Sequence, residues 1–307
     1  MKRALLLSLL ALSGCPQTGA SPSATLVGLR DMVRVGEFMV ATSTERDELR
    51  VLDLVTGDSA APRRYVRAPN PIQPLSIPVL SSPTRLAADT FYREVDGTGE
   101  EIGGPYVYAS SAGLAQLSIV WAENGAPDGG AFTELTRLNT IAPVTATAGR
   151  GGPPVLLPDG GVDHPTHDTL YFATFDGTMA TLFRAQLGQP RDQTVTPDWQ
   201  NRVLVVLTRQ NETIVDLVAL PDGKVAMATR DLHSGDGSAV VVDDMGTVLT
   251  RLQFPSPVRA IYSHARFTLI LEPQKPNLTV PGGGRIYGVL DESACNDCSG
   301  IVAVDTA

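Results

Sequence analysis

The sequence has few aromatic residues and no sustained helical pattern. Phe, Trp and Tyr together make up 6% of its 307 residues. Outside the N-terminus, no segment repeats apolar residues at the 3.6-residue period of an amphipathic helix. Short runs rich in β-branched residues are instead separated by turn residues, and the chain has 29 Gly and 23 Pro. This pattern argues against a helical protein and predicts an all-β fold.

The sequence also lacks the short motifs of common nucleophile and nucleotide sites. It contains no Gly-x-Ser-x-Gly, which an α/β-hydrolase elbow requires, and no Gly-x-x-x-x-Gly-Lys-Ser/Thr phosphate loop. The glycine clusters at 149–152 and 282–284 do not join a strand to a helix, so we interpret them as flexible loops. Trp121 and Trp199 are interpreted as packing residues rather than as platforms for a ligand.

Basic residues are fewer than acidic ones. The chain has 24 Lys and Arg against 33 Asp and Glu, which gives a formal net charge of −9. Loss of residues 1–14 would remove Lys2 and Arg3 and no acid, and would move this charge from −9 to −11. An acidic body argues against nucleic acid as a partner and against electrostatic binding to anionic lipid.

The N-terminus has the composition of a secretory signal. Met1-Lys2-Arg3 is followed by an apolar run from Ala4 to Leu12 and then by small residues. The run is too short to cross a bilayer as a helix. We therefore expect residues 1–14 to be a signal peptide and the Gly-, Ser- and Pro-rich residues 15–24 to be a flexible tether.

The four residues Leu12-Ser13-Gly14-Cys15 resemble the lipobox of bacterial lipoproteins. The resemblance implies cleavage before Cys15 and lipidation of this cysteine, and multiple acyl chains make a stable membrane anchor. An ordinary signal peptide with a chance cysteine is the alternative. Because Pro16 follows Cys15 in place of an acid, the resemblance implies an exported protein anchored to the cell envelope at the outer membrane.

Cys295 and Cys298 are the other two cysteines of the chain. An even pair in an exported protein is most simply a disulfide. A redox Cys-x-x-Cys normally begins a helix, whereas this pair stands between two expected strands. A metal site would need two further soft ligands nearby, and the sequence shows none. We therefore expect a disulfide between Cys295 and Cys298.

Five hairpins of similar pattern recur along the chain, about every 55–70 residues, as in a repeat architecture. Their strand pairs are 38–42 with 49–54, 106–110 with 116–120, 170–174 with 180–184, 224–229 with 238–243, and 285–290 with 300–305. Further strand-like runs flank most of these hairpins. A unit of four antiparallel strands is the blade of a β-propeller.

Residues 25–307 resemble β-propellers of the broad WD40-like and YVTN-like kind, without a Trp-Asp or Tyr-Val-Thr-Asn signature in each blade. The resemblance implies a single β-propeller domain of about five four-stranded blades. Thr25–Leu29 is expected to be either the inner strand of the first blade or an outer strand that closes the ring. The alternative to closure is a larger ring that is incomplete at the C-terminus, because the fifth unit ends at Ala307 without a fourth strand.

The long connections between the first and second strands of a blade are expected on one propeller face. They are Thr90–Gly103, Gly149–Asp168 and Ser263–Gly284, and the segment Leu187–Asn201 joins them there. Long loops on a rigid scaffold often carry binding residues. The alternative is that these loops are tolerated insertions.

Candidate metal ligands in these loops are few. His164, His167 and Asp168 have the residue types of a zinc or other transition-metal site. Glu94, Asp96, Glu100 and Glu101 could coordinate Ca²⁺ through oxygens, but they do not form a Ca²⁺-loop motif. In both cases a solvated surface is the alternative, and we assign no metal or other cofactor.

Two functions are consistent with this sequence. The first is a binding or scaffolding module at the cell envelope, which uses the loop-rich face for a protein or glycan partner. The second is a lactonase-like hydrolase or lyase, with His164 or His167, His264 and carboxylates gathered around a divalent metal, such as calcium or zinc, at the propeller axis. The sequence leaves open whether the protein is an enzyme.

Overall fold

The computed structural model describes most of the chain after Thr25. The described residues are 26–35, 38–53, 75–95, 98–122, 132–151, 155–156, 162–163, 168–187, 203–207, 209–220, 223–254, 257–263, 267–269, 278–280, 285–290 and 301–305. Within them the structure consists of β-strands, turns and one 3₁₀ turn, Thr44–Arg46. The predicted all-β class is confirmed.

The first sheet has four antiparallel strands in chain order. They are β1 (Met32–Val35), β2 (Phe38–Ser43), β3 (Glu48–Asp53) and β4 (Ser76–Pro78). The expectation that residues 25–29 form a strand is wrong for Leu26–Leu29, which lie outside any strand. The first strand of this sheet is instead β1. Gly28 has a φ of 73°, in the left-handed region that ends a strand, and the carbonyl of Val27 accepts a hydrogen bond from Glu45 N at 3.3 Å.

The second sheet has eight strands and combines two of the predicted units. One half is β5 (Arg85–Val95), β6 (Thr98–Ser110), β7 (Gln116–Trp121) and β8 (Thr133–Asn139); the other is β9 (Val144–Arg150), β12 (Thr169–Phe175), β13 (Ala180–Gln186) and β14 (Val203–Val206). The halves join through a short parallel pairing of β5 with β9, in which Asp89 lies opposite Gly149. The first strands of the two units therefore share backbone hydrogen bonds.

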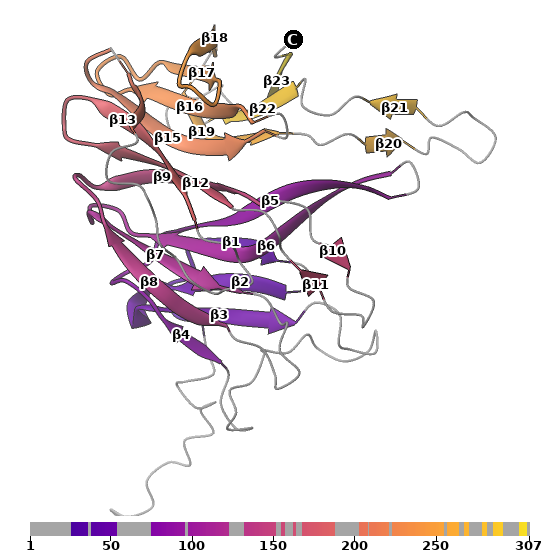
Figure 1. Ribbon diagram of the computed structural model, residues 1–307. Helices are drawn as coiled ribbons and strands as arrows, with labels where there is room; N and C mark the ends of the chain where they lie inside the picture. Colours follow the sequence, from indigo (N-terminus) through magenta and orange to yellow (C-terminus); the bar gives the residue numbers. More distant parts are fainter. Residues whose placement is uncertain are drawn as a thin grey trace, which may run out of the picture.

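The remaining sheets follow the same order. The third is β15 (Glu212–Ala219), β16 (Val225–Asp231), β17 (Gly237–Val242) and β18 (Val248–Gln253); the fourth is β19 (Val258–Ser263), β22 (Arg285–Leu290) and β23 (Ile301–Asp305). Two short hairpins are β10 (Val155–Leu156) with β11 (Val162–Asp163), and β20 (Phe267–Leu269) with β21 (Leu278–Val280). Together with the far ends of β5 and β6, these hairpins project to the same side (Figure 1).

All five predicted hairpins are confirmed. They are β2–β3, β6–β7, β12–β13, β16–β17 and β22–β23. In the described part, the last sheet contains three strands, and no N-terminal strand pairs with β23. The fold is thus β-propeller-like: antiparallel units of four strands, with three described in the last, succeed one another with their first strands side by side (Figure 1).

Each apolar core lies between successive units. One joins β1–β4 to β5–β8 through residues such as Val40 and Val107, and another joins β5–β8 to β9–β14 through Tyr106 and Phe172. Two further cores connect the later units in the same way. Since each fully buried large side chain contributes about 1.5–3 kcal/mol, these interfaces supply most of the apolar stabilisation.

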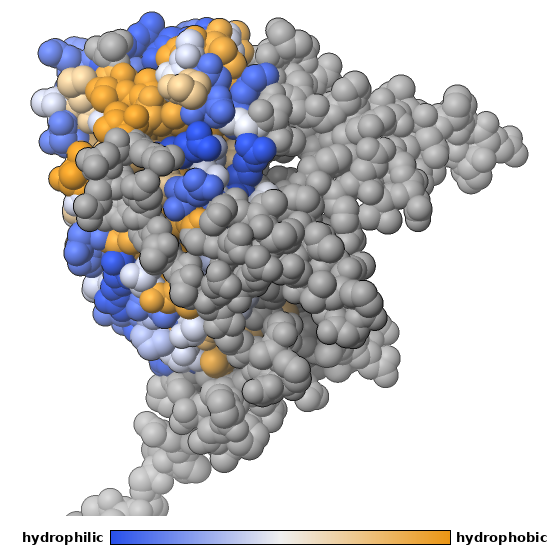
Figure 2. Space-filling view, viewed as in Figure 1, coloured by the Kyte–Doolittle hydropathy of each residue, from blue (hydrophilic) through white to orange (hydrophobic). Residues whose placement is uncertain are grey.

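The outer strands of two neighbouring units, β14 and β18, expose apolar side chains. These are Val203 and Val206 on β14, Val248 and Leu249 on β18, and Met245 in the turn before β18. Figure 2 shows apolar side chains gathered in the upper part of the face in view, over the region where Figure 1 places β13 and β16. Arg184 on β13 donates to the carbonyl of Asp244 at 3.0 Å, which ties the two units together beside this surface.

A buried polar network crosses the sheet β15–β18. Glu212 accepts hydrogen bonds from Thr229 Oγ1 at 2.6 Å and from Arg251 Nη2 at 3.1 Å, and Arg251 Nη1 also contacts Ser238 Oγ at 3.1 Å. Each of the four strands thus contributes one side chain. Burial raises the pKa of Glu212, but the hydrogen bonds from Arg251 and Thr229 outweigh it and lower the pKa overall.

We expect Glu212→Gln to lower the free energy of unfolding by about 2–4 kcal/mol at pH 7, because Arg251 loses its buried counter-ion. Since the pKa of Glu212 is lowered by folding, this stabilisation is present above its usual pKa of 4.5 and is lost as the pH falls below it. Urea unfolding at pH 7 and pH 4 measures both effects.

The matched control for this prediction is Glu134→Gln. Glu134 forms an ion pair with Arg137, whose side chain is 43% exposed, so this substitution should cost less. Equal losses for the two variants, or a Glu212→Gln effect that does not shrink at acidic pH, would contradict the assignment.

Candidate functional site

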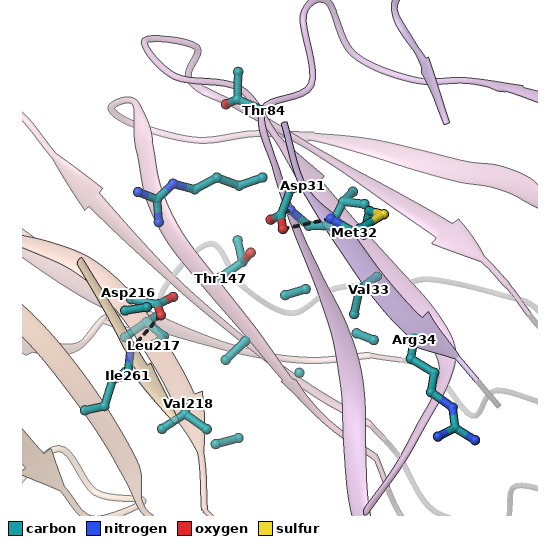
Figure 3. Close-up of a pocket in the computed structure, with 18 of the residues that line it drawn as sticks. Asp31, Met32, Val33, Arg34, Thr84, Thr147, Asp216, Leu217, Val218 and Ile261 are labelled. Atoms are coloured by element: carbon teal, nitrogen blue, oxygen red, sulfur yellow. Dashed lines mark hydrogen bonds between the residues drawn. The ribbon is translucent and has the colours of Figure 1, made fainter. Parts of the chain in front are cut away.

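The first strands of the five described units line one cavity, which we call the axial cavity because it lies between these strands. Its volume is about 910 Å³, and β1, β5, β9, β15 and β19 all contribute to its wall. The lining runs from the strand starts, at Arg30, Thr84 and Arg259, to residues near the strand ends, at Arg34 and Gly149. Figure 3 shows labelled side chains from four of these strands around the cavity. The cavity wall therefore comes from strands of five units rather than from one loop.

Small side chains make room for this cavity. The alanines of its wall are Ala87, Ala88, Ala148, Ala219 and Ala260. Gly149 also lines it, and a Cβ at this position would collide with the carboxyl group of Asp89 and the ring of Tyr108. Small residues are therefore frequent where the first strands face this cavity.

Two aspartates connect neighbouring first strands at the cavity. Asp31 Oδ2 accepts a hydrogen bond from Leu86 N of β5 at 2.8 Å, and its Oδ1 accepts one from Met32 N at 2.8 Å. Asp216 Oδ2 accepts a hydrogen bond from Ile261 N of β19 at 2.9 Å (Figure 3). Each carboxylate thus pairs a backbone N–H of the next unit, which would otherwise lack a partner at the inner edge of its sheet.

Asp216 is the carboxyl group at the cavity with the most perturbed acidity. Loss of hydration on burial raises its pKa to about 6, and the nearby Asp31 adds to the increase. The hydrogen bonds from the N–H groups of Ile261 and Leu217, and the positive charge of Arg85, oppose this shift. Asp216 therefore changes charge in the mildly acidic range.

Arg85 extends from β5 towards β15. Its Nη1 donates a hydrogen bond to the carbonyl oxygen of Val215 at 2.6 Å. Thr84 and Arg85 also line a second cavity of about 260 Å³, together with the starts of β9 and β15. Arg85 therefore belongs to the walls of both cavities.

A buried carboxyl pair lies behind the wall. Asp89 Oδ1 accepts a hydrogen bond from the Tyr108 hydroxyl at 2.5 Å, and Asp89 Oδ2 accepts one from Tyr106 N at 3.3 Å. Burial, followed by the charge and hydrogen bond of Asp168, raises the pKa of Asp89 well above its usual value. The raised pKa favours the protonated form of Asp89, and the contact of the two carboxyl groups joins β5 to the start of β12.

Of the predicted metal ligands, Asp168 is described, and its residue is 1% exposed. His164 and His167 lie outside the described residues, as does His264. The side chains of Glu94, Asp96, Glu100 and Glu101 and the residues Cys15, Cys295 and Cys298 also lie outside this part. Lipidation, the disulfide and the metal hypotheses therefore stay predictions. Among the described residues, no three His, Cys, Asp or Glu side chains gather to hold a metal ion.

Within the described part of the chain, no helix is long and apolar enough to cross a membrane.

Sequence reasoning missed Asp31, Arg85 and Asp216. Each acts on another unit of the chain: Asp31 on Leu86, Arg85 on Val215, and Asp216 on Ile261. The only available signal was a charged residue at or beside an expected inner strand, where small apolar residues predominate. A charged residue beside an expected inner strand can be noticed in a sequence, but the residue of another unit to which it bonds cannot be identified there.

No protein-family model and no curated protein matches this chain. Among solved structures, hydrazine synthase from Kuenenia stuttgartiensis is similar at 11% identity and a TM-score of 0.47, covering 94% of this chain and 69% of the other. The Nup133 β-propeller domain from Vanderwaltozyma polyspora is similar at 9% identity and a TM-score of 0.40, covering 90% and 70%. These scores carry no argument about function, so the β-propeller-like assignment rests on the strand arrangement of this chain.

We expect Asp216→Asn to flatten the pH dependence of stability. Because folding raises the pKa of Asp216 from 3.8 to about 6, the stability that its protonated form contributes is complete below pH 3.8 and is lost as the pH rises through 6. The shift corresponds to about 3 kcal/mol between pH 4 and pH 7.5. An asparagine keeps an acceptor for Ile261 N, so urea unfolding across this range should show the difference.

Asp176→Asn is the control. Hydrogen bonds from the Met179 and Thr178 N–H groups lower the pKa of this exposed carboxylate, so its contribution has the opposite sign. An Asp216→Asn variant that keeps the full pH dependence of the unmodified protein would refute the assignment.

Proposed function

We propose that this chain is an exported, lipid-anchored β-propeller of five blades that acts as a binding module at the cell envelope and takes its ligand in the axial cavity. The observation that carries the proposal is the cavity of about 910 Å³ shared by the first strands β1, β5, β9, β15 and β19. Five first strands around one space, each followed by a hairpin, support five blades.

The position and size of the cavity support ligand binding. Sites for small organic ligands are typically concavities of about 300–1,000 Å³ with mostly apolar walls and a few placed polar groups. Alanines form much of this wall, and hydrogen bonds hold Asp31 and Asp216 in place. The scaffold is therefore arranged before a ligand enters, which reduces the entropy lost on binding.

The loop-rich face remains our proposed route for a larger partner. The hairpins β10–β11 and β20–β21 and the extension of β5–β6 project to one side (Figure 1). A protein or glycan partner on this side would lie near the strand ends where Arg34 and Gly149 line the cavity. The lactonase-like alternative needs His164, His167 or His264 at the axis, and no described residue favours it.

We expect Cys15→Ala to release the mature protein from the membrane fraction, because the lipid on Cys15 would be its anchor. Fractionation of cells into soluble, inner-membrane and outer-membrane parts, followed by immunoblotting, measures this. Cys295→Ala is the control, since it removes a cysteine away from the lipobox and should leave the protein membrane-bound. A Cys15→Ala protein that stays in the membrane fraction would disprove the anchor.

We expect Ala87→Phe to abolish ligand binding by filling the axial cavity. A panel of sugars, amino acids and organic acids is screened against the detergent-extracted mature protein by thermal shift and calorimetry. Compounds that bind the unmodified protein should lose affinity for Ala87→Phe and keep it for Leu232→Phe, which enlarges an exposed side chain in a turn. Equal binding to both variants would place the ligand elsewhere and contradict the axial site.

A further inference from the structure

The axial cavity carries an excess of positive side chains in a protein whose overall charge is negative. Its charged residues are the arginines Arg30, Arg34, Arg85 and Arg259 and the aspartates Asp31 and Asp216. The whole chain has a formal charge of −9. A cleft that concentrates one sign of charge between low-dielectric walls raises the local concentration of oppositely charged ions. The charge of the described cavity lining therefore favours an anion.

The two aspartates do not neutralise these arginines by direct pairing. Asp31 accepts hydrogen bonds from two backbone N–H groups, and Asp216 accepts one from Ile261 N. Within the described residues, no ion pair involves Arg30, Arg85 or Arg259. The carboxylates hold neighbouring units together, and the guanidinium groups of Arg30, Arg85 and Arg259 form no ion pair with them.

Arg85 is the best placed of these arginines. A guanidinium group presents five N–H donors in a plane, which suits the two oxygens of a carboxylate or phosphate. In the described structure, one of its hydrogen bonds goes to the Val215 carbonyl. Arg85 lines both the axial cavity and the smaller cavity beside it, so a ligand in either cavity would lie next to this residue.

The remaining lining fits the rest of such a ligand. Arg30 and Arg259 lie at the strand starts, at the same end of the cavity as Arg85, whereas Arg34 lies near the other end. Thr84 and Thr147 add hydroxyl groups, and alanines supply an apolar wall for a short carbon skeleton. A volume of about 910 Å³ accommodates a small organic molecule.

We infer that the axial cavity binds a small organic anion whose carboxylate or phosphate group is held by Arg85, with Arg30 and Arg259 adding positive charge at the same end. The inference rests on the proposed function, because it names the chemical class of the ligand for the same cavity. Bidentate hydrogen bonds from Arg85 set the orientation of the anion.

The test measures binding of succinate, inorganic phosphate and the neutral succinamide to the detergent-extracted mature protein by calorimetry, at constant ionic strength. We expect saturable binding of succinate or phosphate and none of succinamide. Arg85→Gln should weaken anion binding at least about tenfold, since it removes a charge-assisted contact. Arg85→Lys should weaken it less, because it keeps the charge but loses the planar fork.

Arg46→Gln is the control, since it removes the same charge outside the cavity and should leave the affinity unchanged. Thermal unfolding of each variant confirms that it is folded. A preference for phosphate over succinate would assign the site to phosphorylated ligands, and the reverse to carboxylates; both support the inference. Anion binding that is equal in the unmodified protein and in Arg85→Gln, or no anion binding at all, would overturn it.

The binding experiments distinguish a failure of the proposed function from a failure of the inference about anions. If a neutral compound of the screening panel binds in a manner that Ala87→Phe abolishes, while no anion binds, the cavity is a ligand site and only the anionic class is wrong. If neither neutral nor anionic compounds bind, both proposals are wrong.

Discussion

The fold depends on how the first strands are held to one another around the axis. A first strand is the edge of its sheet, so the N–H groups on its inner side have no sheet partner. Asp31 and Asp216 solve this problem with carboxylates that accept hydrogen bonds from the next unit, at Leu86 N and Ile261 N. Between β5 and β9 the backbones pair directly, which the absent side chain of Gly149 permits. The N–H groups of the inner edge are thus satisfied by carboxylate side chains at β5 and β19, and by backbone pairing between β5 and β9.

The chemistry of the cavity follows from this construction. Carboxylates placed at the axis lose hydration, which is why burial is the first cause of the raised pKa of Asp216. The positive charge of Arg85, which donates to the neighbouring Val215, offsets part of this cost, and Arg85 lines two cavities. The buried carboxyl groups that join the first strands thus lie beside arginines in the same cavity. Guanidinium groups in such a place are suited to bind an anion.

The sequence predicted the hairpins well because their signal is local. Strands such as Phe38–Ser43 and Val225–Asp231 combine β-branched or apolar residues with a nearby turn, so that neighbours along the chain determine the pairing. The inner strand Met32–Val35 was missed because it is short and carries Arg34 within it. The run at Leu26–Leu29 looked more strand-like, but Gly28 adopts a left-handed conformation that no apolar pattern reveals.

The candidate site was harder to predict because its contacts are distant in sequence. Asp31 and Leu86 are 55 residues apart, and Arg85 and Val215 are 130 apart. Asp168 illustrates the same limit, since beside two histidines it resembled a metal ligand. In the structure Asp168 is buried against Asp89 of the preceding unit. In this fold, residues at the same height on the first strands of neighbouring units come into contact. Which residues share a height depends on the strand register, which the sequence does not reveal.

The parallel pairing of β5 with β9 has a mechanical consequence. Where other units meet through side chains, these two share one continuous eight-stranded sheet, and the contact between Asp89 and Asp168 also joins them. Because the two units share backbone hydrogen bonds as well as apolar contacts, we expect them to unfold as one cooperative block. Under a pulling force on the N-terminus, we therefore expect β1–β4 to detach before this block opens.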